Sequence, residues 1–219
     1  VQDAFAGKAA ASFTTSIHFY DNTAHSYLTA VAEDLGMRWA GSFSPDMYDI
    51  MKDENREILM QFADHIFGFA ESRSPVERIF PVMLKPERSY KPADVVTARA
   101  VSGSLKTIVV TDYTDENGSV KGMVSRFRDS VTGDVKVINL NDLKINGGCL
   151  GCCECGLDYR CIYTGKDEFI DFYNREIKTA DMVVFAGALK DRYLSAKFKE
   201  VFDRGFFNTH TPTLVGKQV

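Results

Sequence analysis

Apolar and polar residues alternate along the first third of the chain in blocks typical of strands and helices. Residues 8–16 are small, apolar and β-branched, which predicts a buried strand. The next block carries apolar residues at helical spacing up to Gly36, a residue type that often ends helices. The segment MRWAGSF then predicts a short second strand, and residues 53–69 predict a second helix. Residues 1–70 therefore predict a β-α-β-α unit.

The pattern breaks at residues 71–104 and resumes at Leu105. This stretch holds four of the six prolines together with many charges, a composition typical of a linker or an extended arm. Beyond it, LKTIVVTDY, DVKVINL and DMVVFAG predict strands that alternate with helices over 118–131, 167–180 and 193–204. Such alternation predicts a parallel sheet wrapped by helices, in which ligands bind at the carboxyl ends of the strands beside a topological switch point.

Both ends of the sequence interrupt this pattern. The chain begins at Val1, and residues 213–219 have the pattern of a strand that is just beginning. A Gly-Lys pair at 7–8 leads into the first predicted strand, and a second Gly-Lys pair occurs at 216–217. We therefore expect a fragment with parts of two α/β domains; alternatively, the two pieces complete one fold in permuted order, or processing trimmed the ends. The expected parts are residues 1–70, the linker 71–104, and residues 105–219.

Composition and charge exclude several classes of partner. The 219 residues include 26 Lys+Arg and 30 Asp+Glu, and the net charge of −4 gives no general attraction to nucleic acid or anionic lipid. The longest apolar runs, such as MVVFAGAL, are far shorter than the roughly 20 residues that cross a bilayer. We therefore expect no nucleic-acid partner and no membrane segment.

Loop 111–119 joins a predicted strand to the start of a predicted helix. Backbone N–H groups at a helix N-terminus attract phosphate through unpaired donors and the helix dipole. Gly118 allows the backbone to approach a ligand closely. Asp112, Asp115 and Glu116 place negative charge in the same loop and oppose an anion. A phosphate site and an ordinary polar turn are therefore both open.

Two further loops follow predicted strands. Loop 15–23 contains His18 and Phe19, and a planar ring can stack on aromatic side chains there. Alternatively, the aromatic side chains make only local packing contacts and His18 is exposed without a functional role. We expect no functional role for the other three histidines either. In loop 186–195, Gly187 permits a tight turn against a flat ligand, and the neighbouring Lys and Arg can hold a phosphate or a nicotinamide nucleotide. A solvated helix start is the alternative.

All five cysteines lie close together in one segment. Cys149, Cys152, Cys155 and Cys161 form C-x2-C-x2-C-x5-C, whereas Cys153 fits no position of this motif. Four thiolates in a glycine-rich run suit an iron–sulfur cluster, and a four-thiolate zinc site is the competitor. Disulfide-switching or unligated thiols stay open as well, although the odd count disfavours a disulfide framework. Reduced cysteines indicate the cytoplasm.

The region 105–219 resembles the flavodoxin-like NAD(P)H-dependent flavin reductases, and specifically the iron–sulfur flavoproteins. In that family the first strand leads to a phosphate loop and the second to a compact cysteine motif. The third strand leads to a loop and a helix with a Lys-x-Phe-x-Asp-Arg-like ending. The corresponding segments here are TDYTDENGS, CLGCCECGLDYRC and FAGALKDRYLSAKFKEVFDR. Residues 1–70 look like the other half of such a fold, so the resemblance implies a flavodoxin-like three-layer α/β sandwich with a parallel sheet.

The resemblance also implies cofactors and the residues that hold them. It implies FMN, NAD(P)H as reductant, and a 4Fe–4S cluster close to FMN. The residues implied for the flavin phosphate are Thr114, Asn117, Gly118 and Ser119. Those implied beside the flavin ring are Ala186, Gly187, Ala188 and Leu189, and for a flavin of the first unit Thr15, Ser16, Ile17, His18 and Phe19. The implied cluster ligands are Cys149, Cys152, Cys155 and Cys161.

These features predict an enzyme, a flavin-dependent oxidoreductase that passes electrons from NAD(P)H through FMN to a small-molecule or protein acceptor. One alternative is a non-enzymatic flavodoxin-like electron carrier with the same cofactors. Another is a flavin-free metal or thiol-switch module, which the acidic loop 111–119 favours. By analogy with the family we also expect a homo-oligomer.

Overall fold

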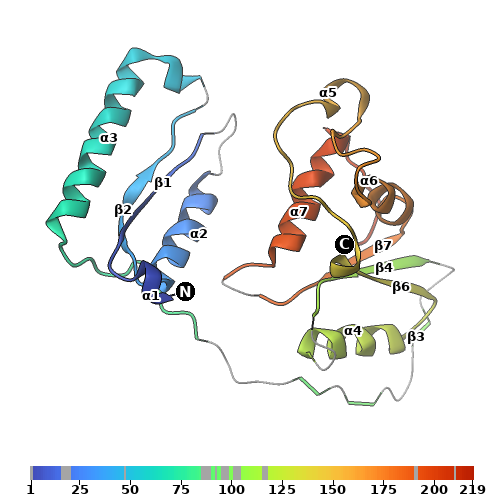
Figure 1. Cartoon of the computed structure of the whole chain (residues 1–219). Coiled ribbons are helices and arrows are strands. Elements are labelled where there is room, and N and C mark those ends of the chain that lie inside the picture. Colours follow the sequence, from blue (N-terminus) through green and yellow to red (C-terminus); the bar gives the residue numbers. More distant parts are fainter. Residues whose placement is uncertain are drawn as a thin grey trace. The chain divides into compact units, whose positions relative to one another are not determined.

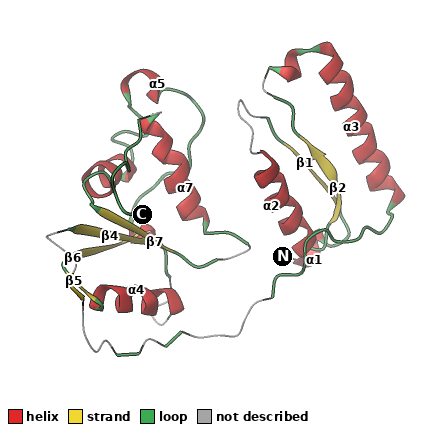
Figure 2. Ribbon diagram, turned by 180° about the vertical axis from the view of Figure 1, so that it is seen from behind, coloured by secondary structure: helices red, strands yellow, loops and turns green. Residues whose placement is uncertain are grey.

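The structure, a computed structural model, divides the chain into two compact units, Val1–Pro86 and Glu87–Val219 (Figures 1 and 2). No helix among the residues it describes is long and apolar enough to span a membrane. The described residues are 2–15, 21–46, 48–84, 90–91, 93–94, 99–100, 105–114, 118–189, 192–209 and 211–219.

The first unit has the predicted β-α-β-α order. Strands β1 and β2 pair in parallel, and helices α2 and α3 lie on opposite sides of this pair (Figure 1). The parallel pairing requires a crossover connection, which α2 supplies. The elements are α1 (Gln2–Phe5), β1 (Ala9–Phe13), α2 (Asp21–Asp34), β2 (Arg38–Phe43), the 3-10 turn η1 (Asp49–Met51) and α3 (Asp53–Ser72).

The chain that follows α3 is fixed against the first unit by a buried carboxylate. Glu33 of α2 is buried, and its two carboxylate oxygens accept the N–H groups of Ile79 and Phe80 at 2.8 and 3.0 Å. Arg78 donates to the Glu33 carbonyl at 2.6 Å and to the Asp34 carboxylate at 2.7 Å. A buried carboxylate requires such donors. The first part of the predicted linker 71–104 therefore belongs to the first unit, whose boundary falls at Pro86.

The second unit is a three-layer α/β arrangement. Its central strands have the order β6-β4-β7 and are all parallel, with α4 on one side of the sheet and α6 and α7 on the other (Figures 1 and 2). A separate parallel pair joins the short strands β3 and β5. The elements are β3 (Arg99–Ala100), β4 (Lys106–Thr111), α4 (Ser119–Asp129), β5 (Val131–Thr132), β6 (Asp134–Asn139), η2 (Leu140–Asp142), α5 (Cys155–Asp158), α6 (Phe169–Phe172), the π-helical turn η3 (Tyr173–Ile177), β7 (Met182–Ala186), α7 (Ala196–Arg204) and η4 (Gly205–Asn208).

The core of the second unit lies on both faces of β4. Ile108 and Val110 point to one face and Val109 to the other, and all three are at most 1% exposed. This explains the unbroken apolar run of the strand, because a central parallel strand is covered on both sides. The helix predicted over 167–180 begins at Phe169 and widens into the turn Tyr173–Ile177, whose two end residues are both buried.

The two Gly-Lys pairs adopt the same turn in the two units. Gly7 and Gly216 have φ angles of 74° and 77°, which favour glycine. Lys8 N–H donates to the carbonyl three residues earlier at 3.1 Å, and Lys217 N–H does the same at 3.1 Å. Gln218 then forms a parallel bridge with Met182 of β7. Of the segment 213–219, whose pattern predicts the beginning of a strand, Gln218 alone bridges to β7 and the residues before it form turns. The assignment to two domains stays a prediction.

Candidate functional site

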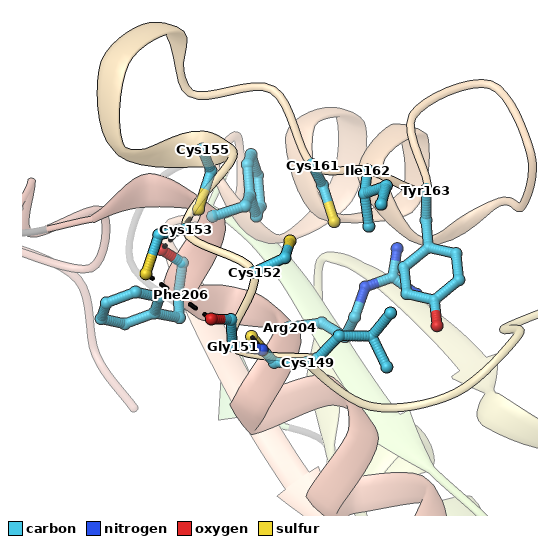
Figure 3. Close-up of a pocket in the computed structure, with 12 residues that line it drawn as sticks. Cys149, Gly151, Cys152, Cys153, Cys155, Cys161, Ile162, Tyr163, Arg204 and Phe206 are labelled. Atoms are coloured by element: carbon cyan, nitrogen blue, oxygen red, sulfur yellow. Dashed lines mark hydrogen bonds between the residues drawn. The ribbon is translucent and has the colours of Figure 1, made fainter. Parts of the chain in front are cut away.

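The five cysteines line one apolar cavity of about 30 Å³ in the second unit, which we call the cysteine cavity (Figure 3). The sulfurs of Cys152, Cys155 and Cys161 turn toward the same space, and Cys149 lies at its lower edge. The Cys153 thiol points away and donates to the Gly151 carbonyl at 3.6 Å. All five are free thiols. The structure thus brings all five cysteines to one cavity, and Cys153 differs from the other four in the direction of its thiol.

The four thiols are close enough to influence one another electrostatically. Cys155 is only 8% exposed, and burial is the main cause that raises the pKa of its thiol above the ordinary value. Negative charge on Cys149, Cys161 and Cys152 raises the same pKa further. Four thiolates around this cavity therefore require positive charge nearby, from a metal or from the protein.

The inner wall of the cysteine cavity is a buried ion pair. Arg204, at the end of α7, is 1% exposed and donates to both oxygens of Asp167, at 2.7 and 3.1 Å. It also donates to the Gly147 carbonyl at 3.2 Å. Its guanidinium lies over the rings of Tyr163 and Phe169, with 4.4 and 4.6 Å from the central carbon to the ring centroids. The wall is therefore both charged and held in one orientation.

The ion pair holds both of its partners in the charged state. Burial by itself raises the pKa of Asp167, but hydrogen bonds from Arg204 and from backbone amides outweigh it and lower that pKa below its usual value. Burial likewise disfavours the Arg204 cation, and Asp167 together with Cys161 more than compensates, so the pKa of Arg204 is raised. The cysteine cavity therefore has a permanent cation at its wall.

Sequence reasoning did not assign Arg204 or Asp167 to the cysteine cavity. Arg204 appears in the sequence only as the last residue of the helix signature. Its position indicates burial, because Arg204 follows Phe198 and Val201 at intervals of three residues on the same face of the helix, and all three are buried. A charge on the apolar face of a helix predicts a buried partner, but the partner itself, 37 residues away, follows only from the fold.

The donor set can be tested against a single metal ion and against a cluster. Among the described residues, no group of three or more His, Cys, Asp or Glu side chains is arranged as the ligands of one ion. A tetrahedral zinc site needs four sulfurs at about 2.3 Å from one point. In a 4Fe–4S cluster each cysteine binds a different iron atom, so the sulfurs surround a larger volume. A donor set of four thiols is one that a cluster can use, although a cluster needs more room than 30 Å³. The exposed segment with Cys149 and Cys152 has to move outward to provide it.

A second cavity, of about 370 Å³, lies at the carboxyl ends of the strands of the same unit, and we call it the edge cavity. It is lined by the loops that follow β4 and β7 and by the first residues of α4 and α7. Its volume falls within the range of small-molecule sites. The predicted residues Thr114, Gly118, Ser119 and Ala188 all line it.

The edge cavity offers several features that suit a phosphate group. Gly118 is the N-cap of α4 and provides no side-chain acceptor, so the first N–H groups of that helix lack a side-chain cap. Lys197 of α7 also lines the cavity and brings a positive charge, which its ion pair with Glu200 at 3.5 Å and Asp112 on the β4 loop partly oppose. Ser195, another lining residue, has a buried hydroxyl without a hydrogen-bond partner among the described residues. The residues present therefore fit a phosphorylated ligand.

Two asparagines that sequence reasoning missed hold the β4 loop in place. Asn139 donates to the Tyr113 carbonyl at 2.9 Å, and Asn141 donates to the Asp112 carbonyl at 2.7 Å. Asn139 is the last residue of β6, the neighbouring strand, and Asn141 follows it in η2, so they reach the loop only because β6 and β4 pair. Asn141 also lines the edge cavity.

The other described residues predicted to bind FMN in the second unit are not among those that line the edge cavity. Gly187 is needed by the protein itself, because a Cβ at this position lies 2.5 Å from the ring of Phe198. Leu189 is 76% exposed, and neither it nor Ala186, the last residue of β7, is among the residues that line the edge cavity. Asn117 lies outside the described residues.

In the first unit, the residues predicted beside a flavin are mostly outside the described part of the chain. Thr15 is exposed after β1, and Ser16, Ile17, His18 and Phe19 are not described. The described residues near this end of β1 form a polar network instead.

The network centres on a histidine for which the sequence predicted no role. His25 of α2 is buried, its Nδ1 is hydrogen-bonded to Ser12, and its Nε2 lies 2.9 Å from the Thr14 hydroxyl. Thr14 in turn donates to the Asp21 carboxylate at 2.9 Å. Because α2 and β1 supply its members, the network fixes the helix against the carboxyl end of the strand.

Comparison with known proteins gives no match: no family model, no curated protein and no solved structure matches the chain. The resemblance to flavin reductases described from the sequence therefore stays an expectation.

Proposed function

We propose that the chain belongs to a flavin-dependent oxidoreductase that exchanges electrons between FMN and a 4Fe–4S cluster, with NAD(P)H as reductant. The observation that carries the proposal is the arrangement of the cysteines. Four of them, in the spacing of a cluster motif, line one cavity, while Cys153 lines it too but directs its thiol to the Gly151 carbonyl. Four thiolates without a second ligand type suit iron–sulfur chemistry.

The strand order supports a flavodoxin-like fold for the second unit. In chain order, the first parallel strand (β4) lies between the second (β6) and the third (β7), and Gln218 pairs on the far side of β7. This is the 2-1-3-4 order of flavodoxin-like sheets, in which FMN binds where the first and third strands separate. The edge cavity is lined by the loops of those two strands, which is the reason to assign FMN to it.

Within this proposal, the residues of the chain bind and orient the two groups. Cys149, Cys152, Cys155 and Cys161 bind the iron atoms. The first N–H groups of α4 and the ammonium of Lys197 hold the flavin phosphate. When bound, FMN supplies the change from two-electron hydride chemistry to one-electron transfer.

Helix α7 sets the separation of the two cavities. Ser195 and Lys197 line the edge cavity at its beginning, and Arg204 lines the cysteine cavity at its end. The nine residues of α7, Ala196–Arg204, correspond to roughly 13 Å of helix. We therefore expect electrons to pass between the groups along this helix, without direct contact between them.

The proposal is tested by anaerobic reconstitution of the purified chain with iron, sulfide and FMN, followed by addition of NADPH. We expect both flavin and iron–sulfur absorption, and bleaching of both by NADPH. Bleaching by dithionite alone indicates the non-enzymatic carrier. A colourless protein contradicts the proposal and favours the second candidate.

The second candidate is a flavin-free thiol switch. The observation that favours it is that Cys149, Cys152 and Cys153 are exposed free thiols on one short loop. In that case mild oxidation produces a disulfide in place of metal binding. Thiol titration before and after oxidation, in protein shown to lack iron, separates this candidate from the main proposal.

A further inference from the structure

We propose that Arg204 raises the reduction potential of the cluster proposed for the cysteine cavity. It does so by donating its Nε–H to the sulfur of Cys161 and by placing a fixed positive charge beside the cluster. This inference rests on the proposed cluster in that cavity. It assigns a role to a residue outside the cysteine motif and makes the buried pair of Arg204 and Asp167 part of the redox site.

The first observation is an unused hydrogen-bond donor. The two terminal nitrogens of Arg204 bind Asp167 and the Gly147 carbonyl, but its Nε–H has no partner among the described residues. An unpaired donor on a side chain that is 1% exposed is costly, and such groups require an explanation. Arg204 lines the cysteine cavity together with Cys161, so a sulfur ligand is within the same space (Figure 3).

The second observation is that the guanidinium is held rigidly. Tyr163 and Phe169 cover its plane at 4.4 and 4.6 Å, and Asp167 binds its two ends. Asp167 is itself fixed by the N–H groups of Asn146 and Phe169, at 3.1 and 3.2 Å. The donor is therefore oriented before any ligand binds, which is the condition for a strong effect on a metal centre.

The consequence for redox chemistry follows from charge. A one-electron reduction adds one negative charge to the cluster and breaks no bond to cysteine. Hydrogen bonds to the sulfurs and nearby positive charge stabilise the reduced form and raise the reduction potential. Asp167 has the opposite charge and offsets part of this effect. Arg204 and Asp167 thus act on the potential with opposite signs.

The test is a dithionite titration of the reconstituted full chain, with iron content measured on the same samples. We expect Arg204→Lys, which keeps a cation for Asp167 but removes the planar Nε–H, to retain four iron atoms. Its reduction equilibrium should become about tenfold less favourable, a lowering of the potential by about 59 mV. Arg128→Lys is the matched control, because Arg128 is an exposed arginine of α4 paired with Asp129, and its potential should stay at the wild-type value.

A second variant keeps the inference testable if Arg204→Lys does not fold. Asp167→Asn leaves Arg204 charged and removes the opposing carboxylate, so the potential should rise. A merely structural pair predicts lower stability for both variants and no opposite shifts. Unchanged potentials in an iron-loaded Arg204→Lys protein, or shifts of the same sign in both variants, overturn the inference and leave the cluster in place. Absence of iron from the wild-type protein overturns the proposed function, and this inference with it.

Discussion

The two cavities at the ends of α7 differ in almost every physical respect. The cysteine cavity is small and apolar, has thiols on one side, and has the buried Arg204–Asp167 pair as its wall. The edge cavity is about ten times larger and is lined by backbone, hydroxyls and charges of both signs. The first suits a group bonded to side chains, and the second suits a group held by hydrogen bonds and charge. One scaffold thus separates the two kinds of binding by the length of one helix.

The largest expected effect comes from removing a thiol that faces the cysteine cavity. Cys155→Ser replaces a buried thiol that faces the other three cysteines, so we expect loss of most of the iron after reconstitution. Cys153→Ser is the matched control, because its thiol points away, and it should bind iron as the wild type does. Iron analysis of the two proteins is the measurement. Equal iron in both variants contradicts the assignment of ligands.

The contribution of the Arg204–Asp167 pair to the stability of the folded protein should decrease at low pH. The pKa of Asp167 is lowered in the folded protein, so its contribution to stability is present above the unfolded pKa and is lost as the pH falls through the folded one. We expect Asp167→Asn to lower the free energy of unfolding by about 3 kcal/mol at pH 7. This difference should shrink below about pH 4. Urea unfolding at several pH values measures it, and a difference independent of pH refutes the account of this pair.

The third prediction concerns a substitution next to the edge cavity that does not alter the residues lining the cysteine cavity. In Gly187→Ala, the new Cβ lies 2.5 Å from Phe198, whose ring is fully buried. We expect a loss of roughly 2 kcal/mol in the free energy of unfolding. Gly156→Ala is the control, since no atom lies within 4 Å of its Cβ. Thermal or urea unfolding compares them, and similar stabilities of the two variants contradict the tight contact between the β7 loop and α7.

The smallest expected effect concerns the charge of the edge cavity. Lys197→Met removes the ammonium that lines it, and we expect FMN binding to weaken about tenfold. Riboflavin, which lacks the phosphate, should bind the variant and the wild type equally. Lys199→Met serves as control, because Lys199 is on the same helix and is also ion-paired, with Asp203, but is not among the residues that line the edge cavity. Fluorescence titration gives these affinities, and an equal loss for riboflavin argues against a phosphate at this position.

The two cavities also differ in how far the sequence predicts them. The cysteine cavity follows from a motif of thirteen neighbouring residues, whose compact spacing predicts that its cysteines lie together, as they do around the cavity. The edge cavity follows from the strand–helix alternation, which predicts that loops 111–119 and 186–195 meet at one edge of the sheet. Local patterns predict where these segments lie because each element has an ordinary periodicity, but they do not predict all the residues that line the two cavities.

What the sequence does not predict depends on residues distant along the chain. Arg204 and Asp167 meet because α7 and the segment before α6 cover the same side of the sheet. Asn139 reaches the β4 loop only through strand pairing. His25 becomes part of a network because α2 lies against β1, and nothing in its own neighbourhood in the sequence indicates this. Gly187, predicted beside a flavin, is required by the Phe198 ring, a contact that only the fold reveals.

The most direct test of the central claim is the amount of iron and acid-labile sulfide bound per chain after anaerobic reconstitution of the wild-type protein. A cluster on Cys149, Cys152, Cys155 and Cys161 predicts four iron atoms and four sulfides per chain. A single zinc ion, or no metal with all five thiols still titratable, contradicts it.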